Sequence, residues 1–145
     1  MKVYFDNCAI QRSLDDRSNY RNRIEAEAII VLIEMAEQGE LFMVSSDVLL
    51  FELKNTPDLD RIAYGMKFLD LSKETFSLTK EIVDLARRFE NNGIKSIDAL
   101  HLAIADFNHI DYLCTCDDRF LKKAAEIKHN NTRVILPTKL IEEIL

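Results

Sequence analysis

Residues 96–107 read Ser-Ile-Asp-Ala-Leu-His-Leu-Ala-Ile-Ala-Asp-Phe, and this segment is the most apolar helix-compatible run in the chain. Its large apolar side chains recur every three to four positions, at Ile97, Leu100, Ile104 and Phe107. Alanine and leucine occupy the other faces, so the segment predicts a helix that is apolar nearly all round and therefore buried. We expect Ser96 to be its N-cap, which places the carboxylate of Asp98 in the first turn, beside unpaired amides and the positive end of the helix dipole. An acid there can simply stabilise the helix start, so any chemical role for Asp98 depends on the rest of the chain.

Length, charge and cysteine content limit the classes of protein to consider. The 145 residues fit one domain, residues 1–145, which should bury about 70% of its unfolded surface. The net charge is −6, from 19 Lys and Arg against 25 Asp and Glu, which argues against a protein that coats nucleic acid but allows a local phosphate site. Cys8, Cys114 and Cys116 lack the spacing of zinc ligands, so we expect reduced thiols in a cytoplasmic protein. Because no apolar run approaches roughly 18 residues, we expect no membrane span.

Segments typical of strands and of helices alternate along the chain. The predicted strands are residues 2–5, 41–44, 67–71, 112–116 and 133–136. The predicted helices are residues 24–36, 48–55, 58–64, 76–89, 96–107 and 120–127, with a short one after Pro137. No two strands are close enough for a tight hairpin, which indicates a parallel sheet. The fold we predict is a three-layer α/β/α sandwich with a central parallel sheet of about five strands.

Four acids fall at one edge of this predicted sheet. Asp6 follows the first strand, Asp117 follows the strand at 112–116, and Asp98 begins the helix that leads to that strand. Glu52 lies close to two helical turns after Ser45, so it leans over the same edge. Ligands of open parallel sheets bind outside the carboxyl ends of the strands. Crowded carboxylates need a compensating charge, and oxygen ligands favour Mg²⁺ or Mn²⁺.

Each of these residues also has a purely structural interpretation. Asp117 can be an N-cap, Asp6 can close an Asx turn, and Glu52 can be an ordinary solvated side chain. His101, one turn after Asp98, is interpreted as a core histidine with a hydrogen bond because its neighbours are apolar. The structural interpretations are good one by one, but they do not explain why four acids share one edge.

The order of these motifs resembles the PIN-domain nuclease family, which includes VapC-like toxin ribonucleases. The matching segments are Val-Tyr-Phe-Asp-Asn at 3–7, Val-Ser-Ser to Phe-Glu-Leu at 44–53, Ser-Ile-Asp-Ala-Leu-His-Leu-Ala at 96–103, and Cys-Thr-Cys-Asp-Asp-Arg-Phe at 114–120. The resemblance implies a Mg²⁺- or Mn²⁺-dependent endoribonuclease that cleaves RNA phosphodiester bonds with metal-activated water. It also implies that the metal-binding acids are Asp6, Glu52, Asp98 and Asp117. Asn7 and Thr115 are the polar neighbours expected behind them.

The same resemblance, and the arginines near the first strand, predict which molecules this protein binds. The resemblance implies a toxin of a type II toxin–antitoxin pair, with an antitoxin protein as partner. Arg12, Arg17, Arg21 and Arg23 leave the first strand beside Asp6, and we predict that they contact RNA phosphates. The alternative interpretation is that these arginines belong to a solvated segment with salt bridges. Apolar residues at 58–66 are predicted to form a homodimer surface.

Two other classes compete with this interpretation. The first is a PIN-like module that binds RNA or protein without catalysis. The second is a receiver-like phosphoacceptor domain, which also gathers acids around Mg²⁺. Such a domain needs an acidic pair after the first strand and a lysine after the last, whereas Asp6 is followed by Asn7 and the last strand ends in Leu136 and Pro137. We therefore favour the nuclease.

Overall fold

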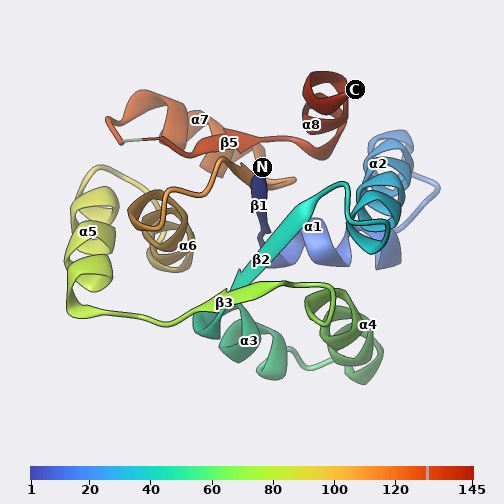
Figure 1. The fold of residues 1–145 in the computed structure, drawn as a ribbon, viewed down its shortest axis with the longest axis horizontal. Helices are drawn as coiled ribbons and strands as arrows, with labels where there is room; N and C mark the ends of the chain where they lie inside the picture. The colour runs from blue at the N-terminus through green and yellow to red at the C-terminus, as the bar shows by residue number, and fades with distance from the viewer. Residues whose placement is uncertain (130) are drawn as a thin grey trace.

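The computed structural model describes residues 1–129 and 131–145, and a parallel sheet lies at its centre (Figure 1). Its strands are β1 (Lys2–Phe5), β2 (Phe42–Ser46), β3 (Glu74–Phe76), β4 (Tyr112–Cys114) and β5 (Arg133–Ile135). They pair in the order β3-β2-β1-β4-β5, and every pair is parallel. The predicted parallel sheet of five strands is confirmed.

Helices cover both faces of this sheet. They are α1 (Asn7–Gln11), α2 (Tyr20–Glu37), α3 (Asp47–Lys54), α4 (Leu59–Leu69), α5 (Lys80–Asn91), α6 (Ser96–Phe107), α7 (Asp118–Glu126) and α8 (Pro137–Ile144), with a 3₁₀ turn at Arg12–Leu14. Figure 1 shows α5 and α6 on one side of the sheet and α1, α2 and α4 on the other. The predicted three-layer α/β/α arrangement is therefore confirmed. Within the described ranges, no helix is long and apolar enough to cross a membrane.

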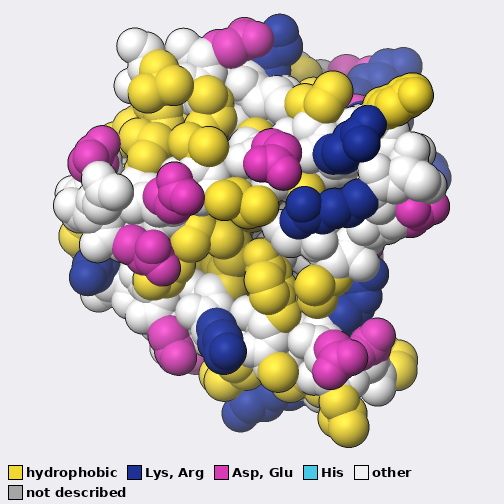
Figure 2. All heavy atoms as spheres, turned by 90° about the vertical axis from the view of Figure 1, so that its right-hand side faces the viewer, with side chains coloured by type: hydrophobic (Ala, Val, Ile, Leu, Met, Phe, Trp, Pro, Cys, Tyr) yellow, Lys and Arg dark blue, Asp and Glu magenta, His cyan; other side chains and the backbone are white. Residues whose placement is uncertain are grey.

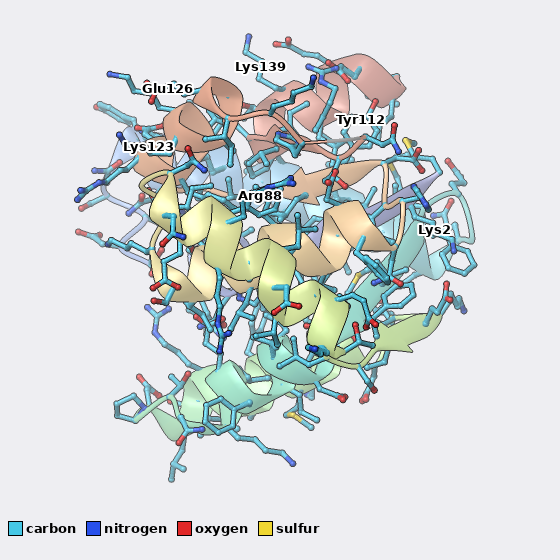
Figure 3. All side chains as sticks on the ribbon, turned by 90° about the vertical axis from the view of Figure 1, so that its left-hand side faces the viewer. Lys2, Arg88, Tyr112, Lys123, Glu126 and Lys139 are labelled. Carbon is cyan, nitrogen blue, oxygen red and sulfur yellow. The ribbon has the colours of Figure 1, made fainter. Side chains whose placement is uncertain are left out.

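Helix α6 is buried as its sequence predicts, and its bounds agree with the predicted segment. It packs against α5 and β4, and α5 lies in front of it on the face shown in Figure 3. Its central residues are completely buried: Ala99, Leu102, Ala103, Ile104 and Ala105. The predicted N-cap is wrong by one residue, because Ser96 is already helical and Lys95 holds the N-cap position. Asp98 is still in the first turn.

The predicted strand at residues 67–71 is wrong, because α4 continues to Leu69 and β3 begins only at Glu74. Asp58 caps α4 with bonds from the Asp60 and Arg61 amides, and the helical spacing of buried residues then extends through Phe68. Short apolar runs fit either a strand or a buried helix, and here the helix is favoured by its cap. The true third strand is a short edge strand with few apolar residues, which its sequence signals weakly.

Two helix starts also differ from the prediction. Helix α2 begins at Tyr20 rather than at residue 24, because the Asn19 side chain accepts a hydrogen bond from the Asn22 amide and caps it. Helix α5 begins at Lys80, capped by Thr79, so Phe76 belongs to β3 instead of the helix. Both differences lie in polar segments where caps, rather than apolar spacing, define the helix start.

The order of the strands creates a switch point at the centre of the sheet. From β1 the chain moves through β2 to β3, and then returns to the other side of β1 to form β4. Phe5 pairs with Cys114, so the carboxyl ends of β1 and β4 lie side by side. Ligands bind at such points in open α/β sheets. The order also differs from the 2-1-3-4-5 order of receiver-like folds, which removes the phosphoacceptor alternative.

Candidate active site

The four predicted acids line one pocket at the carboxyl end of the sheet. Its volume is about 320 Å³. Each acid comes from a different part of the chain: Asp6 from the end of β1, Glu52 from α3, Asp98 from α6 and Asp117 from the start of α7. The structure thus brings together the residues that the sequence placed at one edge.

Asp6 is held by the first turn of the helix that follows it. Its Oδ1 accepts hydrogen bonds from the Ala9 amide at 3.0 Å and from the Cys8 thiol at 3.1 Å. Only 3% of the residue is exposed, and this burial raises the pKa of its carboxyl group, while the bonds from Thr115 and Ala9 lower it. Asp6 is therefore a helix cap and a pocket residue at once.

Asp117 has the same double role at the start of α7. Its Oδ1 accepts hydrogen bonds from the amides of Arg119 at 2.9 Å and Phe120 at 3.2 Å. Its own amide donates to Thr115 Oγ1 at 3.1 Å. In both aspartates the backbone amides of the following helix bond Oδ1.

Asp98 shows that the acids are close enough to repel one another. It is half-buried, and burial raises the pKa of its carboxyl group to about 6 from an ordinary value of 3.8. The negative charges of Asp6 and Asp117 raise it next, and Glu52 adds a smaller contribution. Raised pKa values of this origin are typical of acids that share one site.

Glu52 lines the pocket and contacts His101 there. The Oε1 atom of Glu52 lies 3.0 Å from Nε2 of His101, which also lines the pocket. His101 is only 1% exposed and bonds Tyr4 through its other nitrogen. The predicted core histidine with a hydrogen bond is confirmed, and it lies in direct contact with one of the four acids.

The two expected polar neighbours lie beside the acids. Asn7 is the first residue of α1 and lines the pocket. Thr115 is completely buried, where it contacts Cys8 at 3.3 Å and bonds Asp6 and the Asp117 amide. Thr115 thus connects the two strand ends that carry Asp6 and Asp117.

Two of the four predicted RNA-binding arginines are engaged with acids inside the fold. Arg12 and Arg21 both contact the buried carboxylate of Glu25, at 3.1 and 3.4 Å, and both donate to the carbonyl oxygen of Cys116. Arg21 also forms a double ion pair with Asp118. These contacts hold the loop that carries the Asp117 side chain.

The other two arginines, Arg17 and Arg23, are exposed and do not contact Glu25 or the Cys116 carbonyl oxygen in any bond of the described residues. Arg17 lies 3.6 Å from Glu27, and Arg23 lies over the ring of Tyr20 at 5.3 Å. An arginine over an aromatic ring keeps guanidinium N–H groups available for a phosphate. The segment therefore combines structural ion pairs with exposed cationic groups.

Several pocket residues had no signal in the sequence. They are Cys8, Gln11, Asp15, Thr56 and Arg61. Arg61 donates to Asp15 Oδ1 at 2.8 Å, although the two residues are 46 positions apart. Only the packing of α4 against α1 brings them together. Composition and spacing do not carry that information.

The donor set fits a hard divalent cation. In the part of the chain that the structure describes, no three His, Cys, Asp or Glu side chains form a ready-made metal cluster. Mg²⁺ does not require one, because it commonly keeps several waters and binds through one or two carboxylates. The pocket instead supplies negative charge and oxygen atoms, and a bound cation would offset both the burial of Asp98 and the charges of its acidic neighbours, which together raise the pKa of its carboxyl group.

The chain is a parallel α/β protein with an acidic pocket at the switch point of its sheet. The family model described as PIN domain matches residues 3–126. The chain belongs to the PIN domain family, as its motifs indicated. No curated protein has a sequence significantly similar to it.

Solved structures share the fold at low sequence identity. FitAcB from Neisseria gonorrhoeae is 12% identical with a TM-score of 0.60, covering 94% of this chain and 98% of that one. VapBC2 from Rickettsia felis, bound to a DNA fragment from their promoter, is 15% identical with a TM-score of 0.58, covering 94% and 98%. Mycobacterium tuberculosis VapC20, described as a sarcin–ricin loop cleaving toxin, is 12% identical with a TM-score of 0.57, covering 89% and 98%. These similarities establish the PIN-like fold.

Asp98→Asn should stabilise the metal-free protein at neutral pH. Because the pKa of Asp98 is raised in the folded state, folding is penalised once the carboxylate ionises, and stability is lost as the pH rises from about 3.8 to about 6. At pH 7.5 we expect the free energy of unfolding of the variant to be about 1 kcal/mol higher than that of the wild type. This is less than the whole pKa shift of Asp98 would give, because solvent screens a partly exposed group. The difference should disappear near pH 4. Urea denaturation in EDTA measures both values.

Asp60→Asn is the matched control for this measurement. Asp60 also occupies the first turn of a helix, but it is exposed and does not line the pocket. Its variant should lose only a helix-dipole interaction, so its stability should change by less than about 0.5 kcal/mol. Equal effects of the two substitutions would show that the acids do not repel one another.

Proposed function

We propose that the protein is a Mg²⁺- or Mn²⁺-dependent endoribonuclease that cleaves RNA phosphodiester bonds. The observation that carries this proposal is one pocket lined by all four acids, where burial and then the charges of the neighbouring acids raise the pKa of Asp98. Membership of the PIN domain family, whose members are typically nucleases, supports it. The acids that would hold the metal are Asp6, Glu52, Asp98 and Asp117.

The residues of the chain prepare this pocket for a cation and a phosphate. When bound, the divalent ion supplies an activated water and neutralises charge on the phosphate. Helix amides orient Asp6 and Asp117, and His101 contacts Glu52. Arg61 is a cationic side chain that lines the same pocket, and we assign it to a substrate phosphate.

We further propose a toxin–antitoxin setting in the cytoplasm. FitAcB, VapBC2 and VapC20 are similar to this chain in fold; VapBC2 is bound to a DNA fragment from their promoter, and VapC20 is a sarcin–ricin loop cleaving toxin. An antitoxin protein is the partner that this setting requires. A PIN-like module without catalysis is the alternative, and the cleavage experiment separates the two.

The purified protein should cleave RNA in the presence of Mg²⁺ or Mn²⁺, and EDTA should abolish this cleavage. Asp98→Asn should lose activity by roughly 100-fold or more, because metal-assisted catalysis is worth several kcal/mol. Gel analysis of structured and unstructured RNA measures cleavage. Asp60→Asn should cleave like the wild type. Cleavage that survives both EDTA and the Asp98 substitution would contradict the proposal.

The exposed arginines should contribute to RNA affinity through phosphate contacts. We propose that Arg17 and Arg23, together with the exposed part of Arg21, contact RNA, while Arg12 supports the fold. Arg23→Ala should weaken binding and reduce the slope of log affinity against log salt by about 0.7. Fluorescence anisotropy at several salt concentrations measures this slope.

Lys73→Ala is the control for the arginine variants. Lys73 is exposed and precedes β3, so it lies at the amino edge of the sheet, away from the pocket. Its variant should keep the wild-type slope. If Arg17→Ala and Arg23→Ala also keep that slope, the arginine segment is only a solvated surface.

We also propose that α4 contributes to a homodimer surface. The predicted region at 58–66 forms the first part of α4, and its Leu59 is 79% exposed. Figure 2 shows the side of the molecule on which α2 and α4 lie, where apolar side chains are exposed among charged ones. Helix α2 has the exposed residues Tyr20, Ile24 and Val31. An exposed apolar residue on a helix is a feature of interfaces, although it is not specific to them.

Leu59→Glu should shift the protein toward the monomer in sedimentation velocity at several concentrations. A charged side chain at a buried interface costs free energy because it loses its water. Leu145→Glu is the matched control, since Leu145 is 86% exposed and lies outside α4. Wild-type protein that sediments as a monomer at every concentration would rule out the dimer.

A further inference from the structure

A continuous chain of hydrogen bonds runs from the core to the edge of the pocket. Ser46 Oγ lies 2.6 Å from Tyr4 Oη, which lies 2.6 Å from His101 Nδ1. His101 Nε2 then lies 3.0 Å from Glu52 Oε1. Tyr4, Ser46 and His101 are each at most 1% exposed, whereas Glu52 is partly exposed and lines the pocket. The chain joins β1, β2, α6 and α3.

The direction of each proton in this chain follows from its fixed ends. The Leu49 amide donates to Ser46 Oγ at 3.1 Å, and the serine hydroxyl keeps its own proton available for Tyr4 Oη, 2.6 Å away. The phenol of Tyr4 is neutral at pH 7, and its proton can be donated to Nδ1 of His101, which lies 2.6 Å from Tyr4 Oη. Nε2 of His101 then carries the ring proton and donates it to Glu52.

The opposite arrangement leaves an unfavourable contact. If the neutral ring carried its proton on Nδ1, Nε2 and the Glu52 carboxylate would be two acceptors 3.0 Å apart. The Nδ1–H group would then donate to Tyr4 Oη, and the phenol would have to turn its proton toward Ser46. The Nε2–H tautomer satisfies every member of the chain, which matters because unpaired buried polar groups are costly.

We propose that His101 is a positioning residue, which holds the carboxylate of Glu52 over the pocket through its Nε2–H group while Tyr4 and Ser46 fix its tautomer. The inference rests on the proposed function, because Glu52 is one of the four acids assigned to the metal. It adds to that function the means by which one acid is held in place before the metal binds.

Glu52 needs such support more than the aspartates do. Asp6 and Asp117 have short side chains whose Oδ1 atoms are bonded to backbone amides. Glu52 has a longer side chain, and orienting it costs rotamer entropy. The ring of His101 is itself held by burial and by the ring of Tyr4, at 5.5 Å between centroids. A rigid donor therefore orients the most flexible of the four acids.

The first experiment measures the hydrogen bonds without metal. ¹⁵N NMR of the metal-free protein with labelled histidine should show the His101 proton on Nε2, and side-chain couplings of Glu52 should show one rotamer. Tyr4→Phe removes the donor to Nδ1, so a second tautomer should appear. A neutral wild-type ring with its proton on Nδ1 would overturn the inference.

The second experiment measures Mn²⁺ affinity by isothermal titration. His101→Leu should bind roughly 10-fold more weakly or worse, as is typical when a residue that orients a metal ligand is lost. His101→Gln should stay within about threefold of the wild type, because its amide can still donate to Glu52. His129→Leu, outside the pocket, should bind like the wild type.

A double variant tests whether His101 acts through Glu52. Added to Glu52→Gln, His101→Leu should cause no further loss of Mn²⁺ affinity, since the group that it positions is already changed. Fully additive losses would overturn the inference. His101→Leu also removes one of the two partners of the Tyr4 hydroxyl and leaves only Ser46. Tyr4→Phe with His101→Leu is therefore a second variant, in which both groups are apolar, and it should show the same loss.

The outcomes separate this inference from the proposed function. If the wild-type protein binds no Mn²⁺, the metal-dependent function fails, and the rotamer of Glu52 decides the inference. One rotamer in the wild type that becomes averaged in His101→Leu supports positioning by His101. An unchanged Glu52 rotamer in that variant overturns it, whatever the metal result.

Discussion

Repulsion among four carboxylates at the carboxyl end of the sheet is the constraint on which the rest of the structure depends. The parallel pairing of β1 with β4 places Asp6 and Asp117 side by side, and α6 brings in Asp98, whose pKa rises to about 6. Burying one large aliphatic side chain stabilises a fold by about 1.5 to 3 kcal/mol. Helix α6 buries Leu102 and Ile104 completely, so packing of that one helix offsets the repulsion at its first turn.

Backbone amides and buried ion pairs hold two of the acids in place against this repulsion. Helix amides bond Asp6 and Asp117, and two arginines anchor the loop before Asp117 by donating to the Cys116 carbonyl oxygen. The same arginines share the buried carboxylate of Glu25, which ties the loop to α2. The surrounding fold is therefore organised to keep negative groups together, a state that a bound cation relieves.

The sequence predicted the features that depend on local patterns. Apolar spacing identified α6, alternation of elements identified the parallel sheet, and acids after strands identified the pocket. It failed at residues 67–71, where an apolar run fits a strand and a helix equally well and the distant Asp58 cap decides between them. It also failed to identify Arg12 and Arg21 as supports of the fold, because the Cys116 carbonyl oxygen that both contact lies about 100 residues away in the chain.

The sequence was enough to identify the acids of the pocket and the strand or helix terminus at which each of them lies. It was also enough to predict a parallel sheet, in which the carboxyl ends of the strands meet at one edge. These are consequences of local periodicity and of the direction of parallel strands. Only the tertiary structure decided that Arg61 meets Asp15 across 46 residues and that Tyr4 and His101 form one hydrogen-bonded chain to Glu52. Contacts of this kind depend on how separate elements pack, and no single stretch of sequence encodes their distances.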